Sequence, residues 1–495
     1  KFNLNADKLD LNKLLGSANN KPSTPAKSSS KPADMSAFKN MKLDGKLNIG
    51  SLIYDKYHVS GLNVGIKADG EKLALNGLNV KVDDSQIKGS VGISNFAKPL
   101  YSFDLDIDQV DVDKYVVATP TQKETSSKNT DKPLDLSALK ALNADGSIRV
   151  GSLKYGKTKA SNINIKLKAD GQKLQINPLE AKVDDSQIKA SFAISQFSNP
   201  AYNFNVSIDK LDADKYITKN SADTKSTGDT PIDLSALKKL NATGEAKIGR
   251  LKLANVKTEN VNLSLKASDG IATLSPFSAN LYQGSMNGSL KVDARTTPSI
   301  AFKQSMKNVS VGPLMVDAIN NDMLSGTGTV NIDVTTQGAS VGVLKKGLLG
   351  IASLNLADGA IKGVDIAGSI RDIKNKVNVF KTKDASADKS KKTDFSELTA
   401  TFNIKNGVAH NDDLAMKAPI LRLAKGDSKG DIDIGNEKIN YLAKPTVVKS
   451  LKGQGGADLD ELSGISIPVK ITGSFSDSKY GMDFAAIGTA LAQSK

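Results

Sequence analysis

The sequence predicts a mainly β protein: an elongated repeating antiparallel β-groove, formed by an open twisted sheet, with short helices between repeat units and near the C-terminal region. Two observations lead to this fold class. A strand-like phrase recurs at intervals close to a hundred residues, and apolar and polar residues alternate along many segments between its copies. Alternation indicates strands with one apolar face, and a fixed period indicates one structural unit that is repeated and stacked.

The recurring phrase is an alternating strand followed by a short charged tail. Residues 103–115 read FDLDIDQVDVDKY, and the phrase returns 101 residues later at 204–216 and 101 residues earlier at 2–14. A weaker copy at 302–314 begins 98 residues after the third. Because the chain opens on the phrase that closes each unit, we expect its natural start to lie upstream of Lys1.

Each repeat unit opens with one predicted helical turn. Residues 135–140 read DLSALK, with equivalents at 34–39 and 233–238, and Asp and Ser are candidate N-caps for leucines at helical spacing. In the first unit, strands are predicted at 45–54, 61–68, 72–82, 86–94 and 101–112. Asp-Gly pairs predict tight hairpins at 69–70, 170–171 and 269–270. An estimate of about seven strands per unit, about 4.8 Å apart, gives four units a length on the order of 130 Å.

Polar segments rich in Lys, Ser, Thr and Pro separate the units, and such segments cannot bury enough apolar surface to fold. We therefore expect flexible linkers at 16–33, 117–132 and 218–231, and a further polar linker at 381–393. The remaining predicted parts are the end of an upstream unit at 1–15, repeat units at 34–116 and 135–217, a divergent third unit at 233–316 and a C-terminal region at 317–495.

The C-terminal region carries shorter predicted elements. Two short amphipathic helices, 317–321 and 341–349, flank a strand at 326–335. A strand, an Asp-Gly turn and a second strand are predicted over 354–371. Further strands are predicted within 395–408, 413–418, 430–434 and 464–475.

Composition narrows the class of protein. No stretch approaches 18 uninterrupted apolar residues, so no transmembrane helix is predicted within this sequence. The net charge is +14, but Lys is scattered over polar strand faces and linkers, which disfavours nucleic acid as a partner. The scattered Lys predicts either a solvated β-surface protected from edge-to-edge aggregation or an attraction to anionic lipid headgroups.

Three sets of residues could carry chemistry, and each has a simpler structural interpretation. Ser137 and Lys140 match the S-x-x-K of penicillin-binding enzymes, but Ser36 and Ser235 repeat the motif at unit spacing and its partner motifs are missing. The aspartates of 104–113 alternate with apolar residues along a strand and lack the Gly and Glu of a calcium loop, which leaves only weak calcium binding at the strand end as an alternative.

The third set is the histidines, His58 and His410, which have no repeat equivalents in a chain without Cys. They give no constellation typical of zinc or of a nucleophile–histidine pair. Taken with the first two sets, they lead us to expect no catalytic residue, no metal site and no cofactor, so that the protein is not an enzyme.

The C-terminal region resembles the AsmA family of envelope proteins from diderm bacteria. The family's DGAIKG(I/V)D segment, its F..L.ATF.I..GV strand with a DL.....P continuation, and its IPV.I.G strand match residues 358–365, 395–408, 413–419 and 467–473 in that order. The upstream units are similar to the family's repeats, and 281–288 (LYQGSMNG) is close to its LYGG...G strand. The first two units depart from it, with Asp-Asp-Ser-Gln in place of the Tyr–Gly pair.

The resemblance implies a periplasmic protein, anchored to the inner membrane by a helix upstream of this sequence. It implies conduction of phospholipid between inner and outer membrane, with acyl chains in a hydrophobic β-groove, and with outer- or inner-membrane proteins as further partners. The alternative is a periplasmic scaffold that assists outer-membrane protein assembly and binds no lipid. The groove candidates are apolar residues on one side of alternating strands: Leu62, Val64, Ile66, Phe103, Leu105, Ile107, Ile163, Ile165, Leu167, Phe204, Val206 and Ile208. An open aliphatic groove favours lipid, and a sheet packed shut favours the scaffold.

Overall fold

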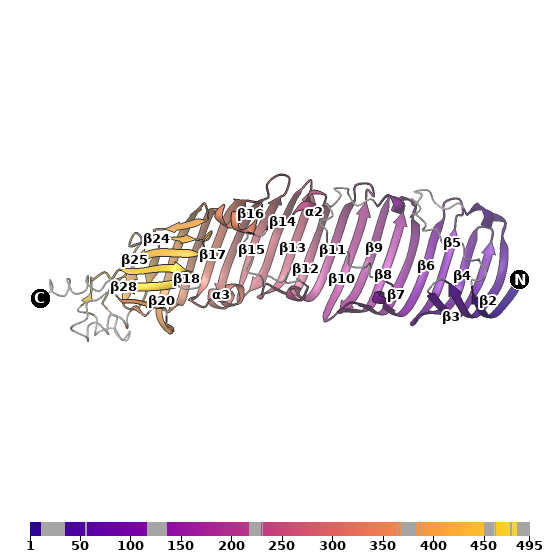
Figure 1. Cartoon of the computed structure of the whole chain (residues 1–495), viewed down its shortest axis with the longest axis horizontal. Helices are drawn as coiled ribbons and strands as arrows, with labels where there is room; N and C mark the ends of the chain where they lie inside the picture. The colour runs from indigo at the N-terminus through magenta and orange to yellow at the C-terminus, as the bar shows by residue number, and fades with distance from the viewer. Residues whose placement is uncertain are drawn as a thin grey trace. The chain divides into compact units, whose positions relative to one another are not determined.

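The computed structural model describes residues 1–10, 35–54, 57–115, 136–216, 231–363, 388–449, 462–475 and 478–482, together with 229, 365, 366, 368, 383–386 and 460. The predicted fold class is confirmed, because the described chain is mainly β, its sheet is open and its helices are short (Figure 1). Contacts divide the chain into an N-terminal body, Lys1–Lys210 with Asn241–Lys247, and a C-terminal body, Leu211–Leu240 with Ile248–Lys495. The predicted linkers 16–33 and 117–132 lie outside the described residues, as does 218–231 apart from Asp229 and Pro231.

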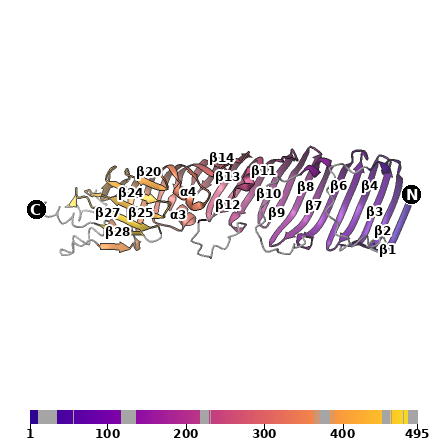
Figure 2. The same ribbon diagram turned by 45° about the horizontal axis from the view of Figure 1, so that its top comes forward.

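Strands of the N-terminal body lie side by side in chain order (Figures 1 and 2). They are β1 (Phe2–Asp10), β2 (Lys42–Tyr54), β3 (Tyr57–Asp69), β4 (Lys72–Val82), β5 (Ser85–Ser94), β6 (Leu100–Asp111), β7 (Asn143–Tyr155), β8 (Thr158–Asp170), β9 (Lys173–Val183), β10 (Ser186–Ser195) and β11 (Ala201–Asp212). Each of the first two repeat units contributes five strands, β2–β6 and β7–β11, which is fewer than the estimate of about seven. Hydrogen bonds join each strand to the next.

The sheet of this body is mixed, which corrects the prediction of an antiparallel one. Strands within a repeat unit are antiparallel, but β1 pairs with β2, and β6 with β7, in parallel. Adjacent parallel strands require a crossover of a dozen or more residues, whereas a hairpin suffices for antiparallel ones. The chain between Asp111 and Asn143 is long enough for that crossover, so each seam between repeat units is parallel.

The predicted Asp-Gly hairpins are confirmed. Gly70 and Gly171 adopt φ of +92° and +82°, which suits glycine. The carboxylate of Asp69 accepts the backbone N–H groups of Glu71 and Lys72 at 3.0 and 2.8 Å, and Asp170 makes the equivalent pair of bonds in the next unit. These bonds favour the charged carboxylate and hold the pKa of both aspartates below the ordinary value.

The helical turn that opens each unit is also present, and its predicted aspartate cap is confirmed in the third unit, where Asp233 accepts the backbone N–H of Ser235 at 2.9 Å. η1 (Ser36–Asn40) and η3 (Ser137–Ala141) begin after Met35 and Leu136, whose side chains make no cap bond, and Asp34 and Asp135 lie outside the described residues. The N–H groups of Met35 and Leu136 bond to the carbonyls of Phe96 and Phe197, at 3.3 and 3.1 Å. These bonds attach both turns to the loops β5–β6 and β10–β11.

The C-terminal body begins with strands of the same lengths as those of the first two repeat units, followed by the longer β17, β18 and β20, and then branches. Its elements are η4 (Ala213–Lys215), α2 (Ser235–Lys238), β12 (Asn241–Leu253), β13 (Val256–Ser268), β14 (Ile271–Leu281), β15 (Gly284–Asp293), β16 (Ser299–Ser310), α3 (Val311–Ile319), β17 (Leu324–Gln337), α4 (Val341–Lys346), β18 (Leu349–Gly363), β19 (Lys383–Ser386), β20 (Asp388–Lys405), β21 (Val408–Asn411), β22 (Ala415–Lys417), β23 (Leu421–Leu423), β24 (Ser428–Asp433), β25 (Lys438–Ala443), β26 (Thr446–Val447), β27 (Val469–Ser474) and β28 (Ser478–Met482). β20 pairs with both β21 and β22, so two series of short strands start from it.

Two predictions in the C-terminal region are wrong. Asp358-Gly359 is a bulge inside the continuous strand β18, because the pairing with β17 passes from Thr327 opposite Ala357 to Ser325 opposite Ala360, one extra residue on β18, and Asp358 has a φ of +49°. Residues 381–393, predicted to be a polar linker, instead include β19 and the start of β20. The polar composition reflects side chains such as Lys391 and Lys392, which point to solvent from a paired strand.

A closed hydrophobic core lies in the C-terminal body. It joins α3, β18, β20 and the short strands that follow, and Leu356, Val447 and Ile467 are fully buried within it. No member of this cluster belongs to the N-terminal body. In the described part of the chain, no helix is both long and apolar enough to cross a membrane.

Candidate functional site

All twelve groove candidates lie in the N-terminal body, on β3, β6, β8 and β11. Along β6, Phe103, Leu105 and Ile107 are half-buried, whereas the aspartates between them are exposed. The same contrast holds along β11 for Phe204, Val206 and Ile208 and the polar residues between them. The predicted two-sided character of these strands is present in the structure.

Register places the candidates in continuous rows across the sheet. One row crosses from β1 to β11 through Phe2, Gly45, Ile66, Leu75, Val91, Phe103, Gly146, Leu167, Ile176, Phe192 and Phe204. A second row runs from β4 to β11 through Leu78, Gly89, Leu105, Ile148, Ile165, Leu179, Ala190 and Val206. The other candidates belong to shorter rows on the same face: Leu62 opposite Ile49, Val64 opposite Leu47, Ile107 opposite Val150, Val150 opposite Ile163, and Ile208 opposite Ile188.

This apolar face is not packed shut. Eleven of the twelve candidates are only half-buried, and Val64, at 3% exposure, is the exception. Residues of the closed core in the C-terminal body are far more buried, as Leu356 and Val447 at 0% show. Within the described residues, the N-terminal body therefore presents an aliphatic surface that remains partly open along eleven strands.

A phenylalanine covers a glycine at every parallel seam of the N-terminal body. A Cβ on Gly146 would lie 2.4 Å from Cδ2 of Phe103, so the ring rests directly on the glycine of the next repeat unit. Phe2 covers Gly45, and Phe204 covers Gly244, in the same way. The glycines allow each ring to lie flat against the sheet, where it does not stand up into the groove.

The opposite face is polar and is held together by ion pairs and backbone contacts. Arg149 of β7 contacts Asp104 at 2.8 Å and Asp106 at 2.5 Å across the parallel seam, and this guanidinium lowers the pKa of Asp106. The carboxylate of Asp113 accepts the backbone N–H of Gly156 at 2.9 Å, which fastens the charged tail of one unit to the first hairpin of the next.

The predicted calcium-like aspartates are thus engaged with protein groups: Asp108, for instance, accepts the backbone N–H of Gln86 at 2.8 Å. The acidic and histidine side chains of the described residues form no group of three or more that could hold a metal ion.

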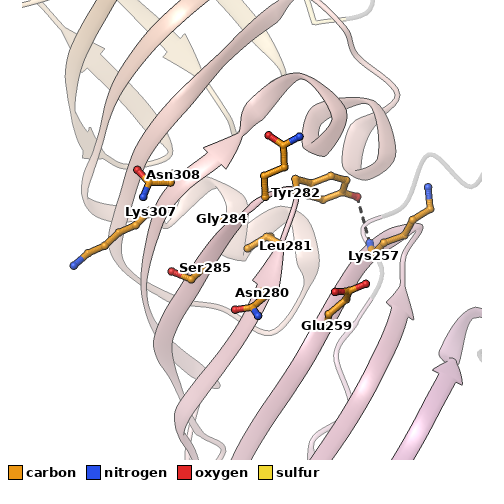
Figure 3. A pocket seen from close by; sticks show the side chains of 10 residues that line it. Lys257, Glu259, Asn280, Leu281, Tyr282, Gly284, Ser285, Lys307 and Asn308 are labelled. Carbon is orange, nitrogen blue, oxygen red and sulfur yellow. Dashed lines mark hydrogen bonds between the residues drawn. The ribbon is translucent and has the colours of Figure 1, made fainter.

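Solvent-open hollows of the described surface are lined mainly by polar residues, and one of them also includes Ile107, Val150 and Ile163 of a shorter apolar row. In the C-terminal body, a hollow of about 640 Å³ is lined by a cross-strand series, Glu259, Asn280, Ser285 and Lys307 (Figure 3). Beside it, the hydroxyl of Tyr282 donates to Asp317 at 2.6 Å and accepts the backbone N–H of Lys257 at 3.2 Å. Partial burial and the bond to Asp317 raise the pKa of Tyr282 to about 12.

This contact explains a departure of the first two units from the family pattern. In the first unit, Tyr115 donates to Asp83 at 3.0 Å, so the tyrosine comes from the tail of the phrase and the aspartate from the β4–β5 turn. In the third unit, the turn supplies Tyr282 and α3 supplies Asp317. The exchange preserves a hydrogen bond between the same two parts of the repeat.

The serines of the S-x-x-K motifs stand at the first residue of η1, η3 and α2, at equivalent places in three units. In the third unit, Asp233 accepts the backbone N–H of Ser235 at 2.9 Å. Sequence reasoning missed the seam glycines and the role of Asp113. Repeat spacing could have indicated both, because Gly45, Gly146 and Gly244 recur at 101 and 98 residues.

The AsmA family model matches residues 156–414, which is more than half of the chain. The matched segment includes most of the second repeat unit, the third unit and the start of the branched sheet. Comparisons with curated proteins and with solved structures give no match.

Proposed function

Because this chain belongs to the AsmA family, whose members fit a role in periplasmic lipid transfer or outer-membrane assembly, we propose that it conducts phospholipid along its apolar β-face. In this proposal the protein works in the periplasm and moves lipid between inner and outer membrane. Proteins of either membrane would then be its partners at the two ends.

The observation that carries the proposal is the pair of long apolar rows that stay half-buried in the N-terminal body. Burying an acyl chain of sixteen carbons is favourable by roughly 0.8 kcal/mol per methylene, or about 12 kcal/mol gross. Transfer requires this free-energy gain to change little as the lipid advances, because a deep free-energy minimum at one place would trap the lipid. Rows of Leu, Ile, Val and Phe that pair from strand to strand support such movement, because they offer similar apolar contacts along the face.

The seams between repeat units support the same function. At the parallel seams β1–β2 and β6–β7 the rings of Phe2 and Phe103 lie flat on glycines, so the first row continues across both seams. A ring that stood upright at a seam would obstruct a passing acyl chain. We also propose that the chain is not an enzyme, since its repeated serines serve as starts of structural turns.

One observation favours the rival function, a scaffold for outer-membrane assembly that binds no lipid. The C-terminal body has a closed core around Leu356, Leu421 and Ile467, as a rigid spacer would. In the lipid-transfer proposal, this body serves as a folded end that contacts membrane or partner.

Native mass spectrometry of the protein, extracted without detergent exchange, tests the proposal. We expect bound diacyl phospholipid, and uptake of labelled phospholipid from liposomes by protein that has been stripped of lipid. Protein that is free of lipid and takes up none would favour the scaffold.

A further inference from the structure

The apolar face of the N-terminal body ends at two rims that differ in charge. We define the lysine rim as η1, η3, the β3–β4 and β8–β9 turns and the β5–β6 and β10–β11 loops. The aspartate rim, at the other ends of the strands, consists of the β4–β5, β7–β8 and β9–β10 turns and η2 (Val112–Lys114) with its flanking residues. The difference between these rims carries the inference.

Five lysines stand on the lysine rim: Lys39, Lys72, Lys98, Lys140 and Lys173. All are exposed, and none forms an ion pair with another described residue. The carboxylates of Asp69 and Asp170 on the same rim are occupied by the backbone N–H groups of their own turns. With Glu71 they give three negative charges against five lysines, so the described residues of this rim carry a net positive charge.

The aspartate rim has the opposite balance. It carries Asp83, Asp84, Asp111, Asp113, Asp184 and Asp185, six acidic side chains, against Lys114 and Lys157. Its Lys114 is paired with Asp84, and the neighbouring Lys154 reaches Asp111 at 3.3 Å. A phosphate would meet repulsion here and attraction at the other rim.

Lysines of η1 and η3 lie where the apolar face meets water. Nζ of Lys140 donates to Oγ of Ser198 at 2.7 Å, next to Phe197, which is 2% exposed. Lys39 occupies the equivalent place beside Phe96, whose ring lies 5.8 Å from that of Phe38. A charged group directly above buried aromatic side chains suits an amphiphile, which needs an apolar contact and a polar contact a few ångströms apart.

We infer that the groove binds phospholipid in one orientation, with the phosphate at the lysine rim and the acyl chains directed across the sheet. Along β4, Leu75 lies about 10 Å and Leu78 about 20 Å from Lys72 at strand spacing. The acyl layer of one membrane leaflet is about 15 Å thick. Chains anchored at this rim therefore cover the first long apolar row and extend toward the second. The inference rests on the proposed function. It adds which edge of the apolar face holds the headgroup, and that this edge binds an anionic phosphate.

The test uses one variant with three exchanges on the lysine rim, Lys39→Glu, Lys98→Glu and Lys140→Glu. The matched control carries the same three Lys→Glu exchanges at Lys46, Lys88 and Lys166, which are exposed lysines on the polar face of β2, β5 and β8. Each protein is offered a fluorescent phosphatidylglycerol or a fluorescent diacylglycerol with the same chains. Both probes are presented in phosphatidylcholine vesicles, so that attraction to the donor vesicle is the same. Circular dichroism confirms that each variant is folded.

We expect the rim variant to lose at least about tenfold in phosphatidylglycerol uptake. Each lysine near an anionic headgroup strengthens binding by about fivefold, and the variant replaces three of them. Its diacylglycerol uptake should stay within about twofold of the wild type, and the control should keep both. Equal losses for the rim variant and the control, equal losses of the two probes, or no loss would overturn the inference while leaving the groove intact. A wild-type protein that takes up neither probe would overturn the proposed function as well.

Discussion

The seam between repeat units offers the most sharply defined perturbation, the exchange of Gly146 for alanine. The new Cβ would lie 2.4 Å from Cδ2 of Phe103 and 2.5 Å from the Phe103 carbonyl oxygen. Ordinary contacts are 3.4 Å or more, so the ring and the backbone of β6 must both move by about 1 Å. Overpacking of this kind costs typically 1–3 kcal/mol. Relief of the glycine's chain entropy returns about 0.5–1 kcal/mol, which leaves a net loss of about 1–2 kcal/mol.

Gly65→Ala is the matched control. Gly65 lies on β3 in the same body, and the nearest atom to its new Cβ would be the Asn76 carbonyl oxygen at 3.4 Å. Without a clash, this exchange should be neutral or stabilising by up to about 1 kcal/mol. Urea unfolding gives the global effect, and hydrogen exchange of the β6 and β7 amides shows whether the loss is local to the seam.

Equal stability for the two variants would refute the argument that the ring of Phe103 rests on Gly146. A second variant, Phe103→Leu, separates the ring from the backbone. In combination with Gly146→Ala it should recover part of the loss, because only the contact with the ring is removed.

Four further outcomes follow from other parts of the molecule. Val206→Asp should abolish crosslinking of lipid with little change in thermal midpoint, since the carboxylate on an open face can reach water. The control Asn203→Asp, on the polar side, should change neither the crosslinking nor the midpoint. Unfolding of the Val206→Asp variant would indicate a packed core. The pKa of Asp170 is lower in the folded protein than its ordinary value of 3.8, so the charged carboxylate stabilises its turn at pH values above 3.8. This stability is lost as the pH falls through the folded-state pKa. The thermal midpoint of Asp170→Asn should therefore fall less in acid than that of the wild type. Fluorophosphonate and β-lactam probes should leave Ser137 and its repeat equivalents unlabelled, and stoichiometric labelling would contradict their structural role. Tyr282→Phe should destabilise the third unit by about 1 kcal/mol, as its hydrogen bond to a carboxylate is largely exposed to solvent; an unchanged urea midpoint would show that the bond contributes nothing.

Local patterns allowed the strands of the repeat units to be predicted closely. β4 was placed at its observed bounds, and β6 within one residue at each end, because alternation and Asp-Gly turns act over a few residues. The twelve groove candidates were found for the same reason: the side-chain period of a strand determines which residues share a face.

Features that depend on distant parts of the chain were missed. Pairing of β6 with β7 brings Phe103 against Gly146, and no local pattern near either residue indicates a parallel neighbour. A strand was predicted within 395–408, but the first residues of β20 were missed because they are polar and pair with the end of β18, so their composition is that of a linker. The bulge at Asp358 was predicted to be a turn, since Asp-Gly favours positive φ in either setting.

The central claim is that the half-open apolar face of the N-terminal body holds acyl chains. A photoreactive amino acid at the Leu105 position, irradiated in cells and analysed by mass spectrometry, tests this most directly, with the same amino acid at the exposed Asp104 position as control. We predict a phospholipid adduct at position 105 and none at 104. A protein adduct or no adduct at 105, in a chain that is folded and exported, would contradict the claim and favour the scaffold.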